Sequence, residues 1–378
     1  MKRLLLVACL VASNHLQGAL WHGKSLSELA VINTPVVDLV IQLPYPPHFG
    51  ACPIDPTDPN CPRAHQALKH EVVRIMGKKG NYTRICCENV IYGIDKNGQP
   101  LNSFWIPHDR LVQLQDLSQR EIDALPPPLG TMHNTVVLIL PWKGYSLGTR
   151  FVREAARDTT GTYCVKVLDH DHQTARLIYL PRSRARIEAP VTTTEAQRLF
   201  VSLAHKLVDD AAAQPESVIP YIWGGSSYIT LYRDNNFFIR NNRWERPGPH
   251  RPYSGYDCSE LVLRLAQTSG IPYVCKLTSL MERMLPELRE HEAVEPGQLL
   301  WFPGHVMIIV ENDQIIEARG YGGGYGRVHR IPLAELFEGI TTYAQLRDVI
   351  RTKRPVNLLK RDGTVMTVIK QLKIFKLR

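Results

Sequence analysis

The chain has 378 residues, of which 44% are hydrophobic and 21% are charged, and its formal net charge is +9. These fractions are ordinary for a globular protein, and they exclude a largely disordered chain and a protein built of membrane-spanning helices. The length predicts two or three domains.

The N-terminal stretch MKRLLLVACLVASNHLQGAL has the outline of a secretory signal peptide. Two basic residues, Lys2 and Arg3, precede an apolar run, and the small residues Gly18 and Ala19 follow it. This order is typical of a signal that is cleaved after export, so we expect removal of residues 1–19. The sequence therefore predicts an exported protein of the periplasm or cell envelope.

Export changes the interpretation of the cysteines, because disulfides persist in oxidising compartments. Of the eight cysteines, seven remain once the predicted signal peptide is removed. Cys52 and Cys61 bracket the proline-rich loop CPIDPTDPNC and are candidates for a bridge. An odd number leaves at least one thiol unpaired, which is compatible with a nucleophilic cysteine.

The chain from about 30 to 190 reads as short strands separated by turns. Runs such as VVDLVIQL and YTRICCENVIYGI precede the proline-rich segment ALPPPLG, and TVVLILP and TYCVKVL follow it. We predict two small all-β barrels, over residues 30–125 and 130–190, joined at that segment.

The pattern changes at about residue 194, where helical periodicity replaces the strands. Apolar side chains recur on one helical face of TTTEAQRLFVSLAHKLVDDAAA, behind a threonine cap. The chain continues through a helix near Cys258 to the strand-like runs HVMIIV and QIIEAR. An α+β domain is therefore expected over 194–350.

The octapeptide GYDCSELV places Cys258 at the start of a predicted helix. Asp257 is a good N-cap residue, and Gly270 can end the helix. Backbone N–H groups of a first helical turn stabilise a thiolate and make the sulfur a nucleophile. Taken alone, the octapeptide favours a buried structural cysteine, since free cysteine is among the most buried residue types.

A thiolate nucleophile needs a proton acceptor and a third group that orients the acceptor. His305 begins the strand HVMIIV, and Glu317 lies on the returning strand. If the turn leaves residues 311–313 unpaired, both side chains share one face of the hairpin and lie diagonal to each other. A two-residue turn would put Glu317 on the other face. Each residue alone is ordinary for a strand, but with Cys258 they predict a catalytic set.

Four motifs resemble the NlpC-type cell-wall endopeptidases, a papain-like cysteine peptidase family. They are YIWGG at 221–225, DCS at 257–259, GHV at 304–306 and the position twelve residues after the histidine. The two barrels in front of this domain resemble the bacterial SH3-like modules of the γ-D-glutamyl-L-diamino-acid endopeptidases. The resemblance implies a multidomain fold class, with two small all-β SH3-like barrels followed by an α+β papain-like catalytic domain.

The resemblance also implies a role for each matched catalytic position. Cys258 would be the nucleophile, His305 the base, and Glu317 the group that orients the imidazole. The Cys258 backbone N–H would help to hold the oxyanion. No metal or organic cofactor is implied.

A substrate-binding set is implied around the nucleophile. Asp257 and Ser259 match positions that hold the free amine of an N-terminal L-alanine, and Tyr221 and Trp223 would lie at the cleft. Thr278 would supply a hydroxyl beyond the helix. The first barrel would block the cleft past the amine, so short unlinked stem peptides would be preferred over the intact sacculus.

The sequence departs from the family pattern at four places. The Pro-Arg-x-Ser run expected after the helix is replaced by Cys275, Lys276, Leu277 and Thr278, and Thr278 matches the hydroxyl position if one residue is inserted. Glu260 stands where the family usually has glycine, and Glu317 where it usually has His, Asn or Gln. Residues 226–256 form a much longer connection than usual. Four of its side chains could cover the cleft and meet substrate carboxylates, namely Arg240, Arg243, Trp244 and Arg246. Alternatively, the segment could be a surface insertion without a substrate role.

The positive charge is concentrated at the C-terminus. Residues 351–378 hold nine Lys or Arg against one acid, Asp362, and so supply +8 of the net charge. This basic extension could bind an anionic wall polymer or lipid headgroups, or it could be a solvated extension with KRDG as a hairpin turn. No aromatic-and-basic motif for nucleic acid stands out.

Together these features predict an exported cysteine peptidase that hydrolyses the γ-D-glutamyl–diamino-acid bond of peptidoglycan stem peptides through a thioacyl-enzyme on Cys258. Two alternatives stay open. One is a wall-binding protein whose peptidase fold is inactive, which Glu260 and Glu317 keep in consideration. The other is an amidase or acyltransferase that uses the same Cys–His site.

Overall fold

The computed structural model describes the chain in eight stretches: residues 24–44, 62–129, 134–169, 174–213, 218–229, 238–240, 243–245 and 254–377. The predicted signal peptide and the expected Cys52–Cys61 pair lie outside the described residues. None of the helices within these stretches is both long and apolar enough to cross a membrane.

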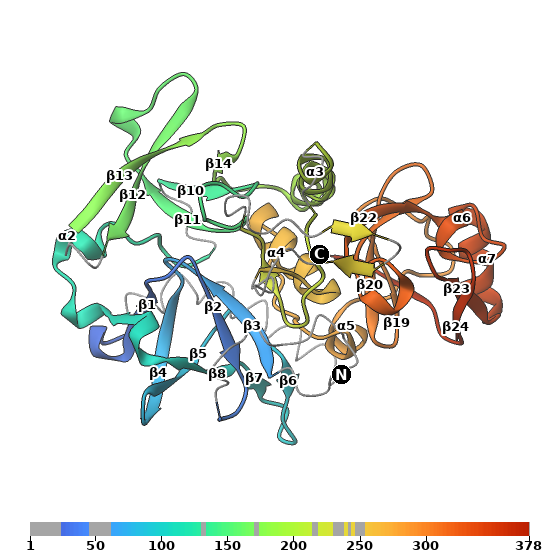
Figure 1. The fold of residues 1–378 in the computed structure, drawn as a ribbon, viewed down its shortest axis with the longest axis horizontal. Helices are drawn as coiled ribbons and strands as arrows, with labels where there is room; N and C mark the ends of the chain where they lie inside the picture. Colours follow the sequence, from blue (N-terminus) through green and yellow to red (C-terminus); the bar gives the residue numbers. More distant parts are fainter. Residues whose placement is uncertain are drawn as a thin grey trace.

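The first structural unit is an antiparallel sheet of seven strands in the order β3-β2-β8-β5-β4-β1-β9, drawn in blue and blue-green in Figure 1. Phe104 and Ile106 alternate with partly exposed neighbours along β8, which is the pattern of a strand with one face in a core. The elements are η1 (Leu26–Glu28), β1 (Leu29–Ile32), β2 (Val36–Val40), β3 (Arg63–Leu68), β4 (Val72–Lys79), β5 (Tyr82–Cys86), β6 (Gly93–Ile94), β7 (Pro100–Leu101), β8 (Ser103–Pro107), η3 (His108–Arg110), β9 (Leu111–Gln113) and η4 (Leu114–Asp116).

The second unit is a five-stranded antiparallel sheet in the order β13-β12-β11-β10-β14, drawn in green in Figure 1. A short helix that the sequence analysis did not expect, α2 (Gln119–Ile122), precedes it, and Ser118 and Glu121 form a capping box at its start. The remaining elements are β10 (Thr135–Leu138), β11 (Arg150–Arg153), η5 (Ala155–Arg157), β12 (Thr162–Asp169), β13 (Thr174–Pro181) and β14 (Ala185–Ile187).

The third unit begins with the long helix α3 (Thr193–Ala212), where the helical pattern of the sequence starts. The expected threonine cap is Thr192, whose side chain accepts from the Glu195 N–H while Glu195 bonds back to the cap. A five-stranded antiparallel sheet follows in the order β22-β21-β20-β19-β25. Its elements and partners are α4 (Cys258–Ser269), α5 (Thr278–Met284), β19 (Leu299–Phe302), β20 (His305–Ile309), β21 (Gln314–Arg319), η7 (Tyr321–Gly323), β22 (Arg327–Pro332) and β25 (Lys373–Phe375).

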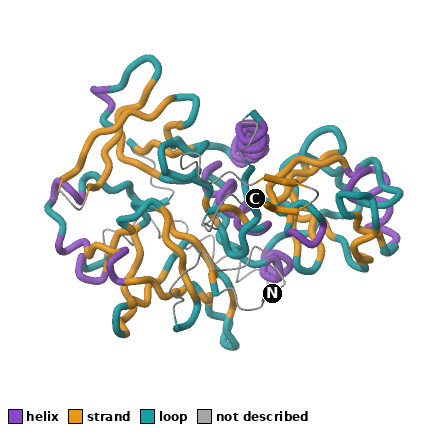
Figure 2. Tube along the Cα trace, in the orientation of Figure 1, coloured by secondary structure: helices purple, strands orange, loops and turns teal. Residues whose placement is uncertain are grey.

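Both faces of this third sheet are covered. On one face, Val306 and Ile308 belong to the core that includes α3 and α4. On the other, Met307 and Ile309 pack in a second core with α6 (Leu333–Leu336) and α7 (Tyr343–Thr352). Figure 2 shows these helices gathered at the centre and one end of the molecule, while strands dominate the other end.

The first sheet and α4 share one continuous hydrophobic core. Val73, Ile85 and Phe104 of the sheet cluster with Leu261 and Leu265 of the helix. Apolar side chains buried between two units stabilise their association by about 25 cal/mol per Å² removed from water. The first unit is therefore packed against the helix that begins at Cys258, near the middle of the view in Figure 1.

Residues 351–378 were expected as a basic extension, and the described part of this range, 351–377, is folded into the third unit. β23 (Val356–Leu359) and β24 (Val365–Ile369) form a hairpin that turns at KRDG, and β25 adds an edge strand to β19. This stretch can fold into the unit because apolar residues are interspersed among its cations. Val356, Leu358 and Ile374 are buried in the second core of this unit.

The long connection 226–256 is described only in part. β15 (Ser226–Ser227) pairs with β18 (Gly255–Tyr256), which brings its two ends together beside α4. β16 (Phe238–Arg240) and β17 (Arg243–Glu245) form a separate hairpin. The side chains of Arg240, Arg243, Trp244 and Arg246, the candidates for contacts with substrate carboxylates, lie outside what the structure describes.

Candidate active site

Cys258 is the first residue of α4. The Asp257 side chain accepts a hydrogen bond from the Glu260 N–H at 2.7 Å and caps the helix, and Gly270 ends it with a left-handed φ of 87°. Cys258 is only 7% exposed. Its thiol is therefore nearly buried beside first-turn N–H groups, which stabilise negative charge.

His305 and Glu317 meet across the β20–β21 hairpin. Ile309 pairs with Ile315, which leaves residues 311–313 in the turn and confirms the predicted register. His305 Nε2 lies 2.6 Å from Glu317 Oε2. The carboxylate is fully buried, whereas the imidazole is 14% exposed. Glu317 therefore holds one ring nitrogen and leaves Nδ1 for a second partner.

The second partner of His305 is the Cys258 side chain, to which it is hydrogen-bonded. Burial alone would lower the pKa of His305. The charge and hydrogen bond of Cys258, followed by those of Glu317, outweigh burial and raise the pKa to about 9. The structure thus brings Cys258, His305 and Glu317 together in that order, and the imidazole is protonated at neutral pH.

A second imidazole contacts Glu317. His329 stands opposite Glu317 in the β21–β22 pairing, and its Nε2 lies 3.1 Å from Glu317 Oε1. Burial lowers the pKa of His329 despite the nearby carboxylate, so this ring is neutral and donates its Nε2–H. Sequence reasoning missed His329; the signal available was its place on the alternating strand RVHRIP.

A cation completes the surroundings of Glu317. Arg319 NH1 lies 3.6 Å from Glu317 Oε1, while its NH2 donates to the Leu359 carbonyl at 2.9 Å. The guanidinium also stacks on Tyr325, 4.9 Å from the ring centroid. Burial would raise the pKa of Glu317, but Arg319 and the hydrogen bonds from two imidazoles lower it well below its ordinary range. Glu317 is therefore a permanent anion.

The expected substrate-binding residues differ in position. Tyr221 is 6% exposed and its backbone bridges that of Tyr256, next to the start of α4. Trp223 is 48% exposed. Thr278 begins α5, and its carbonyl accepts from the Trp301 indole at 2.9 Å. Tyr221 thus lies next to the start of the helix that carries Cys258, Trp223 is half exposed, and Thr278 contacts Trp301 through its backbone.

The Asp257 carboxylate has a full set of neighbours. Oδ1 accepts from the Ser259 hydroxyl at 2.9 Å as well as from the Glu260 N–H, and Oδ2 accepts from the Gly224 N–H at 3.0 Å. Lys276 Nζ lies 3.7 Å from Oδ2. Asp257 and Ser259 are therefore hydrogen-bonded to each other, and the internal cation Lys276 already faces one Asp257 oxygen.

Gly224 explains why the YIWGG motif ends in glycines. Its φ is +67°, a conformation that side chains rarely adopt, and a Cβ here would collide with the Arg63 backbone carbonyl of β3. Arg63 NH1 in turn donates to the Trp223 carbonyl at 3.4 Å. The motif that supplies an N–H to Asp257 is therefore pressed directly against the first sheet.

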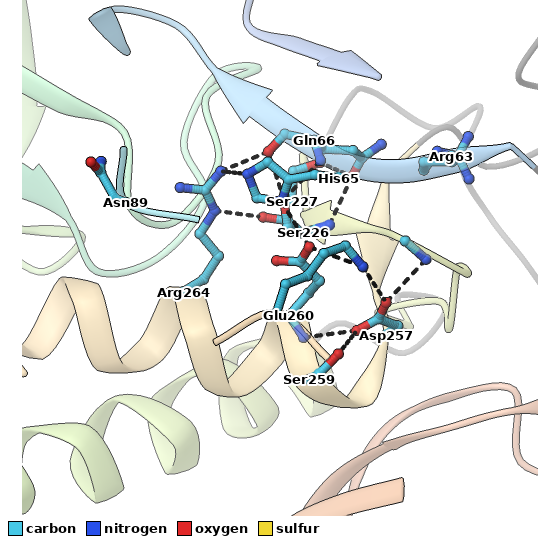
Figure 3. Close-up of polar contacts among 12 residues, drawn as sticks. Arg63, His65, Gln66, Asn89, Ser226, Ser227, Asp257, Ser259, Glu260 and Arg264 are labelled. Carbon is cyan, nitrogen blue, oxygen red and sulfur yellow. Dashed lines mark hydrogen bonds and ion pairs between the residues drawn. The ribbon is translucent and has the colours of Figure 1, made fainter. Parts of the chain in front are cut away.

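Glu260, where the resemblance expects glycine, reaches the first sheet. It is fully buried, and its Oε1 lies 2.7 Å from His65 Nδ1 of β3. Figure 3 shows these side chains in a polar cluster between β3 and α4. Glycine would leave His65 without this partner. The departure at Glu260 is thus matched by a residue of the first unit.

Arg264 ties the same cluster together one turn further along α4. Its guanidinium donates to the Ser226 carbonyl at 3.1 Å, to the Gln66 carbonyl at 2.6 Å and to Glu71 Oε1 at 2.6 Å, as Figure 3 shows in part. Hydrogen bonds of charged donors are the stronger class. The orientation of α4 is therefore coupled to β3 through side chains that the sequence analysis did not single out.

The comparisons with known proteins bear on the fold. No protein-family model matches the chain, and the search of curated proteins finds no match. Among solved structures, an NlpC/P60 family protein from Bacillus cereus is similar with a TM-score of 0.53 and 16% identity, over 81% of this chain and 94% of that chain. At this identity the similarity is one of fold.

Two further solved structures match less well. NlpC2 from Trichomonas vaginalis is 12% identical over 81% of this chain and 92% of that chain, with a TM-score of 0.31. An NlpC/P60 endopeptidase from Photobacterium damselae subsp. piscicida is 10% identical over 93% of this chain and 73% of that chain, with a TM-score of 0.43.

Proposed function

We propose that this protein is a cysteine endopeptidase that hydrolyses the γ-D-glutamyl–diamino-acid bond of peptidoglycan stem peptides. The observation that carries the proposal is the hydrogen-bonded series Cys258–His305–Glu317, which starts at a helix N-terminus. A thiol, an imidazole and an orienting carboxylate in that order are the groups that acyl transfer requires.

The reaction proceeds through a thioester. The Cys258 sulfur attacks the γ-carbonyl carbon, and the oxygen anion that forms is held by the Cys258 N–H at the start of α4. Protonated His305 gives its proton to the leaving amine of the diamino acid as the C–N bond breaks. Water then attacks the thioester while His305 takes one of its protons, and the C–S bond breaks to restore the Cys258 thiolate. The released γ-carboxyl group gives its own proton to solvent.

Asp257 and Ser259 support recognition of a free N-terminal amine. They lie on either side of Cys258 in the chain and are hydrogen-bonded to each other. A carboxylate is the natural partner of an ammonium group. We infer that the free α-amine of an L-Ala-γ-D-Glu stem peptide binds here, so that peptides still linked to glycan are poorer substrates.

The first unit would act as the barrel that closes the cleft, and both small sheets would be SH3-like modules. Support comes from the packing of β3 against the YIWGG motif and α4. Tyr221 and the exposed Trp223 would then contact the peptide where these elements meet.

The proposed cellular location rests on the N-terminal stretch, and a proposed second binding partner rests on the positive charge of the C-terminal region. We infer that residues 1–19 direct export to the cell envelope. The β23–β24 hairpin would meet an anionic wall polymer or lipid headgroups. Exposed cations lie on this hairpin and directly beside it in the chain, namely Arg361 in its turn and Lys353, Arg354 and Lys370 at its ends.

The test uses purified protein and L-Ala-γ-D-Glu-meso-diaminopimelate, with products followed by mass spectrometry. We expect release of diaminopimelate by the wild type and none by Cys258→Ala. Undiminished cleavage by Cys258→Ala would refute the mechanism. Product analysis with added amines separates hydrolysis from acyl transfer, and alkylation of Cys258 at about pH 6 separates an activated thiolate from the ordinary thiol of an inactive wall-binding protein.

A further inference from the structure

A buried carboxylate and a buried ammonium lie directly beneath the Asp257–Ser259 pair. Glu260 is fully buried and Lys276 is 4% exposed. Lys276 Nζ is 3.5 Å from Glu260 Oε1 and 3.7 Å from Asp257 Oδ2, so it lies between the two carboxylates. Neither Glu260 nor Lys276 has a part in the proposed chemistry.

Lys276 carries a positive charge in this position. Burial lowers the pKa of Lys276, but Asp257 and Glu260 outweigh burial and raise it. A cation 3.7 Å from Asp257 offsets the negative charge that a substrate amine would meet there. Taken alone, the pair Asp257 and Lys276 is therefore close to neutral and a poor binding site for an ammonium group.

The charge of Glu260 is then decisive, and its contacts indicate how it titrates. Arg264 NH2 is 3.5 Å from His65 Nε2, so that nitrogen accepts and Nδ1–H donates to Glu260 Oε1. Oε2 has no hydrogen-bond partner among the described residues. Burial raises the pKa of Glu260 to about 7, against the opposing effects of Lys276 and Arg264. Glu260 thus changes charge near neutral pH.

The other titratable groups that face Glu260 do not change charge there. Burial lowers the pKa of His65 well below its ordinary value, so it stays neutral. The pKa values of the buried phenols Tyr256 and Tyr273 and of the Cys87 thiol are raised by burial. Arg264 is held by Glu71 at 2.6 Å. Burial also raises the pKa of Asp257, the subsite carboxyl itself, against the opposing effect of Lys276. Among the groups beneath Asp257 and Ser259, the one whose charge changes near neutral pH is therefore Glu260.

We propose that Glu260 and Lys276 determine how strongly the Asp257–Ser259 subsite selects a charged amine. Lys276 cancels the charge of Asp257, and ionised Glu260 restores the negative charge that attracts an α-ammonium group. This inference rests on the proposed function, because it concerns the amine of the same stem peptide. It assigns a purpose to the acid that stands where the family usually has glycine.

The experiment measures binding, so that it is independent of catalysis. Calorimetry with Cys258→Ala protein compares L-Ala-γ-D-Glu-meso-diaminopimelate with its N-acetylated form, and the readout is the ratio of the two Kd values. We expect Glu260→Gln to reduce the preference for the free amine about fivefold or more. The double variant Glu260→Gln/Lys276→Met is expected to regain the preference for the free amine, because no cation then offsets the negative charge of Asp257.

Glu71→Gln is the matched control. It makes the same chemical change in the same cluster, on the far side of Arg264, and is expected to leave the ratio unchanged. The inference is overturned if Glu260→Gln keeps the ratio, if Glu71→Gln lowers it equally, or if Lys276→Met does not restore it. It is also overturned if neither peptide binds, whereas binding without cleavage by the wild type would refute only the proposed peptidase activity.

A second measurement needs no change in the cluster and therefore no assumption that the Glu260 variants fold. In Cys258→Ala protein, the preference for the free amine should rise between about pH 5 and about pH 7, where Glu260 begins to ionise and the peptide amine stays mostly protonated. A ratio that is flat over this range would contradict the inference.

Discussion

Glu317 and His329 stand opposite each other in the β21–β22 ladder and are joined by a hydrogen bond of 3.1 Å. This bond occupies Oε1, while Oε2 faces His305. His329 thus acts as a positioning residue that keeps the carboxylate turned toward the imidazole that serves Cys258.

Replacement of His329 should therefore lower turnover without weakening substrate binding. We expect His329→Ala to reduce kcat about tenfold, equivalent to about 1.4 kcal/mol, with little change in KM. His329→Gln can still donate a hydrogen bond and should recover most of the loss. Steady-state kinetics on the stem tripeptide measure both quantities.

His205→Ala is a matched control for His329→Ala. His205 lies in the same unit, and its side-chain partners are Glu311, at 2.7 Å, and Arg330 rather than Glu317. An equal loss of kcat in both alanine variants, or no recovery in His329→Gln, would contradict the positioning role.

Glu317 itself should tolerate an amide better than a methyl group. Glu317→Gln keeps an oxygen that can accept from His305, so we expect it to retain substantial activity, within about tenfold of the wild type. Glu317→Ala removes that acceptor and should lose roughly 10²- to 10⁴-fold in kcat. Equal and full activity of both variants in the same assay would remove Glu317 from the site.

The pH dependence of the reaction should report the state of His305. The pKa of His305 is raised to about 9, with Cys258 and Glu317 outweighing the effect of burial. Protonated His305 is the acid in acylation, so kcat/KM should fall as pH rises through about 9. In Glu317→Gln the fall should begin at lower pH, since the negative charge that favours the imidazolium is gone. A pH–rate profile with an unchanged alkaline limb would oppose this assignment.

Glu260 should make stability depend on pH in a recognisable direction. Burial raises the pKa of Glu260 from 4.5 to about 7. Its contribution to the free energy of unfolding is therefore fully present below about pH 4.5 and is lost as pH rises through about 7. Relative to Glu260→Gln, the wild type should lose about 3 kcal/mol of unfolding free energy across that window. Denaturant unfolding at several pH values measures the difference, and a constant difference would argue against a buried, titrating Glu260.

Gly224 should be sensitive to the smallest substitution. In Gly224→Ala a Cβ would meet the Arg63 carbonyl in addition to the strain of a φ of +67°, so we expect a loss of about 2 kcal/mol or more. Gly98 has a φ of +82° with open space around it. Gly98→Ala should therefore cost only about 1–2 kcal/mol. Thermal unfolding that ranks the two variants in the reverse order would contradict the close contact.

The candidate catalytic set was accessible from sequence because its parts are local. A helix cap at Asp257 and a hairpin register between His305 and Glu317 depend on residue type and turn length, and both rules operate over a few residues. Glu260 could be recognised as unusual, but its meaning could not, because His65 is 195 positions away in the chain. Contacts between separate units leave no periodic signal.

The C-terminal stretch shows a different reason for an incomplete prediction. Residues 351–378 were predicted to be an extension because of their charge. The apolar side chains among these cations are nevertheless buried, namely Val356, Leu358 and Ile374. A short strand such as β25 is paired only at a sheet edge supplied by distant residues. Tertiary context decides such strands, and composition alone does not reveal it.

The most direct test of the account is to trap the acyl-enzyme. Protein mixed with L-Ala-γ-D-Glu-meso-diaminopimelate and quenched in acid within the first turnover should gain the mass of the L-Ala-γ-D-Glu acyl group, and peptide mapping should place it on Cys258. A thiol mechanism at this site would be contradicted if turnover occurred with no adduct on Cys258 and either the adduct lay on another residue or Cys258→Ala cleaved the peptide unimpaired.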